Sequence, residues 1–141
     1  MPPNKLSDEN DPADWFYSAG DRLRVADSSW QHEGLTHSGI ELLQEAAERY
    51  LKGYLIAQGW RLTRTHDLRK LLEEAQNYEP EFGNFDTLAK ELTEDFFAQH
   101  YPGGDWSGVG ANYETLRAQV GQMLELIQKS LPQHFSTPPT N

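Results

Sequence analysis

The sequence of 141 residues contains no cysteine. Disulfide bonds, thiolate metal sites and cysteine nucleophiles are therefore excluded from this chain. The polar start of the chain, MPPNKLSDEN, lacks the apolar segment of a secretory signal. No run approaches the roughly 18 apolar residues that a membrane-spanning helix needs. A reducing compartment is compatible with the absence of cysteine, and we expect a cytoplasmic protein with no membrane segment.

Positive charge is also scarce. Twelve Lys and Arg residues stand against 22 Asp and Glu residues, and the formal net charge is −10. Broad binding to nucleic acid requires a basic surface that displaces counterions from phosphates, so we do not expect it here. The total charge does not exclude a small basic pocket. Four of the twelve basic residues lie in one segment of ten, RLTRTHDLRK, over residues 61–70.

Alternating apolar and polar residues, the pattern of a half-buried strand, do not persist anywhere in the chain. Apolar residues instead recur at helical spacing in five segments. They predict helices over 12–30, from about 38 to 59, from about 65 to 75, over 85–99 and over 112–131. Asp11 and Ser38 are the expected N-caps of the first two helices, and Gly59 is the expected stop of the second. Its wide apolar stripe predicts a central position for the second helix.

These segments predict the fold class all-α, an up-and-down helical bundle of four main helices plus one short helix. Residues 1–10 are expected to form a flexible N-terminal lead and residues 133–141 a flexible tail, because both are polar and lack periodicity. The bundle itself is predicted over residues 11–132.

The second predicted helix and its exit carry a resemblance to a known family. They read LLQEAAERYLKGYLIAQG and then RTHDLRKLL. This pattern resembles the HEPN domain (higher eukaryotes and prokaryotes nucleotide-binding domain), in which a Gln, Ala and Glu run precedes Leu-Lys and a Thr-His-Asp-Leu turn opens the next helix. The segment HYPGGD is similar to the Tyr-Pro turn after the family's fourth helix. The resemblance covers about residues 12–131, and the matching residues are Gln44, Ala47, Glu48, Leu51, Lys52, Thr65, His66, Asp67, Leu68 and Leu71.

The resemblance implies a helical bundle that usually forms a homodimer. Members of the family are often prokaryotic and often encoded beside a minimal nucleotidyltransferase, so such an enzyme is the expected partner. Nucleotide binding has been proposed for the family. Many members are ribonucleases, some of them toxins of toxin–antitoxin pairs, and they use an Arg-x4-6-His motif at the dimer interface. We expect no cofactor, and the spacing of His32 and His37 matches no zinc-ligand pattern.

The nuclease motif is incomplete in this chain. Arg61 and His66 have the Arg-x4-His spacing, but they lie at the Thr-His-Asp-Leu turn, whereas the family motif lies near the start of a later helix. The corresponding region, residues 98–113, contains His100 and no arginine. We therefore expect no catalytic residue, and the sequence favours a non-enzymatic function. The alternative is a metal-independent ribonuclease with a displaced site formed by His66, His100 and Arg61.

The basic segment itself predicts a phosphate or nucleotide site. The first backbone N–H groups of a helix are unpaired and favour an anion, and basic side chains add positive charge. The predicted binding residues are Lys52, Arg61, Arg64, Thr65 and His66. In the alternative interpretation, Thr65 or Asp67 only caps the third helix.

Glu48 and Lys52, four residues apart, are expected to pair on the surface or against another helix. Together these features predict a dimeric HEPN-like interaction module that binds a nucleotide or phosphate group. A purely structural partner-binding bundle is the second alternative, after the ribonuclease.

Overall fold

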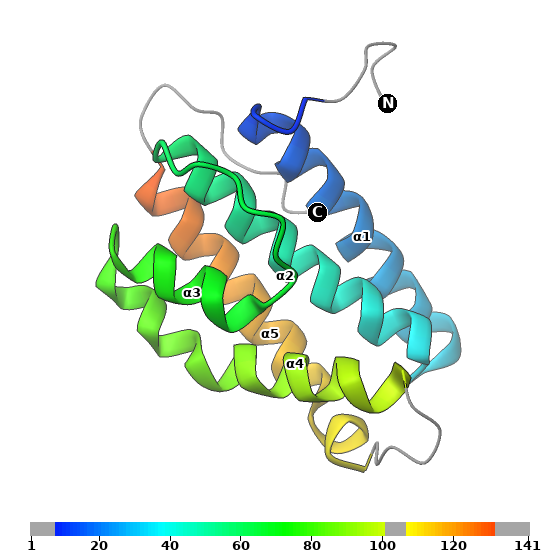
Figure 1. Ribbon diagram of the computed structural model, residues 1–141. Helices are drawn as coiled ribbons and strands as arrows, with labels where there is room; N and C mark the ends of the chain where they lie inside the picture. The colour runs from blue at the N-terminus through cyan, green and yellow to red at the C-terminus, as the bar shows by residue number, and fades with distance from the viewer. Residues whose placement is uncertain (1–7, 101–106, 132–141) are drawn as a thin grey trace.

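The computed structural model describes residues 8–100 and 107–131 of the chain. Every regular element within these residues is helical, which confirms the all-α prediction. The up-and-down order of the bundle remains a prediction. The elements are α1 (Pro12–Glu33), α2 (His37–Ala57), α3 (Leu68–Gln76), the 3₁₀ helix η1 (Pro80–Phe85), α4 (Asp86–His100) and α5 (Ser107–Ser130) (Figure 1).

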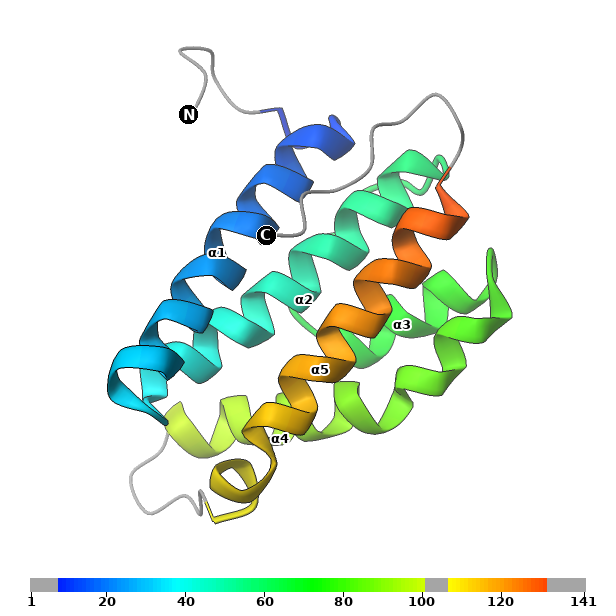
Figure 2. The same ribbon diagram turned by 180° about the vertical axis from the view of Figure 1, so that it is seen from behind.

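Helix α2 lies at the centre of the molecule and contacts α1, α3, α4 and α5. Helix α1 lies beside α2, and the two form a helical hairpin (Figures 1 and 2). Helix α5 lies behind α3 and α4 in Figure 1 and in front of them in Figure 2. Large side chains on several faces of α2 are consequently buried, among them Leu43, Leu51 and Leu55. Burial raises the pKa of Tyr50 and Tyr54 to about 12. The central position predicted from the wide apolar stripe is confirmed.

The ends of the first two helices follow local capping rules. Asp11 caps α1 by accepting a hydrogen bond from the backbone N–H of Ala13 at 3.0 Å, as predicted. The prediction of Ser38 as the cap of α2 is wrong, because Thr36 accepts from the N–H of Gly39 at 2.9 Å. The hydroxyl of Ser29 lies 2.9 Å from that of Thr36, so a side chain of α1 holds this cap in place.

The predicted start of the fourth helix, at about Phe85, agrees with the observed start of α4 at Asp86. The sequence did not predict the 3₁₀ helix η1 over Pro80–Phe85. Proline suits the first turn of a helix because it has no N–H to leave unpaired. The fifth helix was expected from about Asn112 but begins at Ser107. Residues 1–7 of the predicted lead and the predicted tail, 133–141, lie outside the described part of the chain.

Helices α1 and α2 approach each other closely at Gly53. A Cβ atom added to this glycine would lie 2.6 Å from Cε1 of the Phe16 ring. Real Cβ atoms do not come so close to a neighbouring carbon, and Phe16 is itself buried. The absence of a side chain at this position therefore allows the aromatic ring of α1 to pack on the backbone of α2.

We predict that Gly53→Ala lowers the free energy of unfolding by about 1–3 kcal/mol, because the added methyl group overpacks the α1–α2 contact. Urea denaturation monitored by circular dichroism measures the change. Gly121→Ala in α5 is the matched control, since its Cβ would meet only the end of the Arg117 side chain at 3.4 Å. That substitution should raise stability by up to about 1 kcal/mol through helix propensity. Equal effects of the two substitutions would contradict the packing argument.

Candidate functional site

The segment between α2 and α3, residues 58–67, begins at a Schellman motif. The N–H of Trp60 donates to the carbonyl of Leu55 at 2.9 Å, and the N–H of Gly59 donates to that of Ile56 at 3.0 Å. Gly59 has a φ of +93°, a conformation that side chains disfavour. The predicted stop of α2 at this glycine is confirmed. The motif also fixes the position of Trp60, which packs against the edge of the core.

The start of α3 is capped by the chain's own carboxylate. Asp67 accepts a hydrogen bond from the N–H of Arg69 at 3.0 Å. The hydroxyl of Thr65 accepts from the N–H of Asp67 at 3.1 Å. Of the two expected caps, the structure assigns the role to Asp67. Because a negative charge already occupies this end of the helix, a phosphate bound nearby must rely on side chains more than on the helix terminus.

Glu48 and Lys52 form a buried ion pair. Nζ of Lys52 lies 2.8 Å from Oε2 of Glu48, and the side chains are 4% and 6% exposed, respectively. The predicted pairing is confirmed, and of the two expected positions, on the surface or against another helix, the structure shows the second. The indole ring of Trp15, from α1, explains part of the burial, because Nζ of Lys52 lies 5.3 Å from the ring centroid. This distance permits a cation–π interaction.

His66 binds to the same carboxylate from the loop. Its Nδ1 atom lies 3.1 Å and 3.3 Å from the two oxygens of Glu48, while its side chain is 80% exposed. An ionised carboxylate only accepts hydrogen bonds, so Nδ1 is the donor. Among the described residues, Nε2 has no hydrogen-bond partner. Glu48 thus orients the imidazole and leaves Nε2 available to accept a hydrogen bond or a proton.

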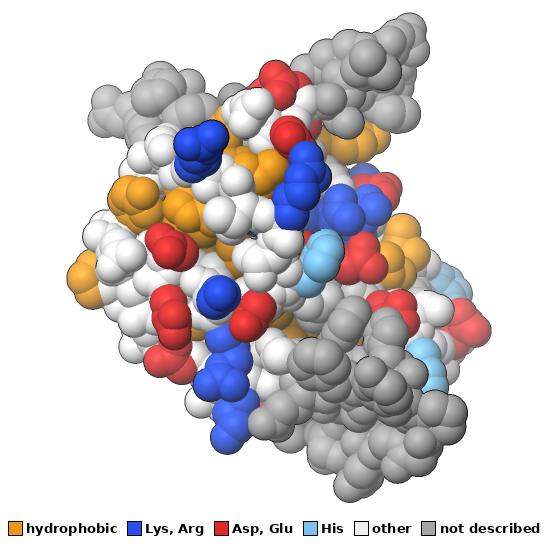
Figure 3. Space-filling model, in the orientation of Figure 1, with side chains coloured by type: hydrophobic (Ala, Val, Ile, Leu, Met, Phe, Trp, Pro, Cys, Tyr) orange, Lys and Arg blue, Asp and Glu red, His pale blue; other side chains and the backbone are white. Residues whose placement is uncertain are grey.

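The two arginines of the loop differ in their environment. Nη2 of Arg64 lies 2.8 Å and 3.0 Å from the two carboxylate oxygens of Glu9, which precedes α1. Arg61 is exposed and forms no hydrogen bond or ion pair within the described part of the chain. The structure thus joins Lys52 to His66 through Glu48, and it does not bring Arg61 into that cluster. The face that carries this loop shows basic and acidic side chains interspersed (Figure 3).

A pocket of about 350 Å³ adjoins the loop and the first turns of α3. Two of the predicted binding residues, Arg64 and Thr65, line it. Sequence reasoning missed the remaining residues of the lining. These are Trp60, Thr63, Lys70, Leu71, Glu73 and Glu74. The position of Trp60 directly after the predicted helix stop is the signal by which it could have been found.

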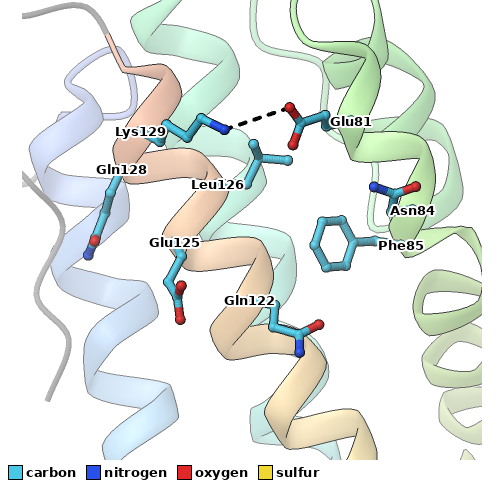
Figure 4. A pocket seen from close by; sticks show the side chains of 8 residues that line it. All are labelled: Glu81, Asn84, Phe85, Gln122, Glu125, Leu126, Gln128 and Lys129. Atoms are coloured by element: carbon cyan, nitrogen blue, oxygen red, sulfur yellow. Dashed lines mark ion pairs between the residues drawn. The ribbon is translucent and has the colours of Figure 1, made fainter.

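A larger hollow of about 690 Å³ lies between η1 and α5 and contains none of the predicted site residues. Its lysine, Lys129, reaches across to Glu81 at 3.7 Å (Figure 4). The other polar groups in its lining are Asn84, Gln122, Glu125 and Gln128. The hollow carries one basic side chain, Lys129, whereas the pocket beside the loop carries two, Arg64 and Lys70. The pocket beside the loop therefore fits the predicted ligand better.

The family model of the HEPN domain matches residues 12–131. The chain belongs to the HEPN family. No curated protein and no solved structure gives a significant match. Membership is consistent with a nucleotide-binding or ribonuclease-like module.

Three further observations concern the predicted sites of this HEPN domain. The side chain of His100 and residues 101–106, which include the predicted Tyr-Pro turn, lie outside what the structure describes. Among the described residues, no three acidic or histidine side chains are grouped to hold a metal ion. None of the helices formed by the described residues has the length and apolar character required to span a membrane.

We predict that Lys52→Met lowers the free energy of unfolding by about 3–5 kcal/mol, because it leaves the carboxylate of Glu48 buried without its cation. The double variant Glu48→Gln/Lys52→Met should recover most of this loss. Lys90→Met, at an exposed position of α4, is the control and should change stability by less than about 0.5 kcal/mol. Chemical denaturation measures all three variants. A single Lys52→Met variant as stable as the parent would contradict the role of the pair.

Proposed function

We propose that this HEPN domain is a dimeric interaction module that binds the phosphate end of a nucleotide beside the loop of residues 58–67. Its expected protein partners are a second copy of the chain and a minimal nucleotidyltransferase, as the family resemblance implies. We further propose that it does not cleave RNA. The observation that carries the nucleotide part is the pocket that joins Arg64 and Thr65 to Lys70 and Trp60.

The chemistry of the pocket suits a phosphorylated ligand. The guanidinium of Arg64 and the ammonium of Lys70 form charge-assisted hydrogen bonds with phosphate oxygens. The hydroxyl groups of Thr63 and Thr65 add neutral donors. The ring of Trp60 offers a surface on which a base of any identity can stack. The volume of about 350 Å³ lies within the range of small-molecule sites.

The acidic side chains of the pocket suggest an orientation for the ligand. Glu73 and Glu74 also line it, and they repel a phosphate group. We therefore place the phosphate near Arg64 and Lys70, and the hydroxyl or amino groups of the ligand near the two glutamates. Carboxylates accept hydrogen bonds from such groups.

The ribonuclease alternative has less support. RNA cleavage without a metal requires a general base and a cation at the same phosphate. His66 is held by Glu48, and no hydrogen bond or ion pair within the described residues joins it to Arg61. The region where the family carries its Arg-x4-6-His motif contains no arginine.

We predict that the parent protein binds ATP and that Arg64→Ala or Lys70→Ala weakens the binding by roughly tenfold. Each substitution removes a charged hydrogen bond to phosphate, and the partial exposure of the site places the effect at the low end of the usual range. Isothermal titration calorimetry measures the affinity. Arg69→Ala is the matched control, because Arg69 is an exposed arginine of α3 that does not line the pocket.

Four results would contradict parts of this proposal. The absence of heat on titration with ATP, or an equal loss of affinity in the Arg69→Ala variant, would contradict the proposal that this pocket binds a nucleotide. A strictly monomeric mass in light scattering would contradict the proposed dimer. Cleavage of mixed RNA by the parent protein, abolished by His66→Ala, would favour the ribonuclease instead.

A further inference from the structure

The segment before α1 brings a carboxylate to the proposed phosphate site. Glu9 places both carboxylate oxygens within 3.0 Å of Nη2 of Arg64, and the two residues lie 55 positions apart in the sequence. Arg64 also lines the pocket beside the loop. The guanidinium that we assign to phosphate binding therefore already holds an anion supplied by the chain itself.

Several hydrogen bonds hold this segment in place. The indole N–H of Trp15 donates to the backbone carbonyl of Glu9 at 2.8 Å. The N–H of Asp8 donates to a carboxylate oxygen of Asp14 at 2.7 Å. Asp11, two residues beyond Glu9, caps α1. The carboxylate of Glu9 thus reaches Arg64 from a backbone fixed to the first turns of α1.

We propose that Glu9 is a built-in competitor for the phosphate group, and that a ligand must displace its carboxylate from Arg64 in order to bind. This inference rests on the proposed function and names the regulation of the same site. The carboxylate makes with Arg64 the same kind of charge-assisted contact that a phosphate oxygen would make. Glu9 therefore lowers the affinity of the site for anions that bind through Arg64.

The ion pair is suited to reversible displacement. Arg64 is 80% exposed and Glu9 is 47% exposed. Ion pairs so open to solvent contribute little net stability, because water and salt screen them. A phosphate group that also contacts Lys70 and the threonine hydroxyls makes more bonds than the carboxylate does. The ligand therefore displaces Glu9, and the competition reduces its affinity by a small factor.

The substitution Glu9→Gln in the chain of 141 residues tests the competition, with ATP as the probe. We expect Glu9→Gln to bind ATP about two- to fivefold more tightly than the parent, the range that an exposed ion pair allows. Asp8→Asn is the matched control, because it removes the same charge one residue away without touching Arg64, and it should leave the affinity unchanged. Glu9→Gln/Arg64→Ala should bind as weakly as Arg64→Ala alone.

A second measurement follows the displacement directly. The indole N–H resonance of Trp15, assigned with Trp15→Phe, should shift when ATP saturates the parent protein, because Trp15 is bonded to the backbone of Glu9. Binding of ATP to the parent with no gain in Glu9→Gln and no shift of this resonance would overturn the inference and leave the proposed function intact. The absence of binding in both the parent and Glu9→Gln would overturn the two together.

Discussion

The buried ion pair between Glu48 and Lys52 constrains the arrangement of the elements around it. Removing two charges from water is costly, and the cost is offset only when each group keeps its partner in good geometry. The pair meets this condition with a distance of 2.8 Å, and Trp15 and His66 complete its surroundings from α1 and from the loop. Because these contacts come from three segments, the central helix, the first helix and the loop before α3 fit together in one way.

The candidate site follows from this constraint and from the ends of the loop. The Schellman motif at Gly59 sets the path of the chain as it leaves α2. At the other end, the cap formed by Asp67 fixes where α3 begins. His66, tied to Glu48, fastens the loop between these points to the central helix. These contacts position Arg64 and Thr65 at the pocket, in addition to the bonds that these two residues form with Glu9 and with the N–H of Asp67.

Local rules predicted much of the fold. The stop at Gly59 and the cap at Asp11 depend on residues close in sequence, so the sequence alone was sufficient for both. Local sequence did not decide which residue caps the N-terminus of α2, because Thr36 and Ser38 are both of types that favour this position. The hydroxyl of Ser29, on a different helix, lies beside Thr36. Patterns within the second helix carry no information about that contact.

The site was predictable only in part, because its arrangement also depends on contacts between residues that are distant in the sequence. The spacing of Glu48 and Lys52 indicated a pair, but their burial depends on Trp15, which lies more than thirty residues away. The basic segment indicated positive charge, but the partner of Arg64 is Glu9, and no local pattern links the two. Lys70 was not among the predicted binding residues, yet it lines the pocket together with Trp60. Periodicity locates helices, and it does not show which distant side chains meet.

The buried pair holds the loop and thereby positions the proposed phosphate site, although neither Glu48 nor Lys52 lines the pocket. The affinity of the double variant Glu48→Gln/Lys52→Met for ATP tests this claim most directly, measured by calorimetry at a temperature where circular dichroism shows the variant folded. The predicted result is a clear loss of affinity, of roughly threefold or more, because His66 loses the charged acceptor that fastens the loop. An affinity equal to that of the parent protein in the folded variant would contradict the claim.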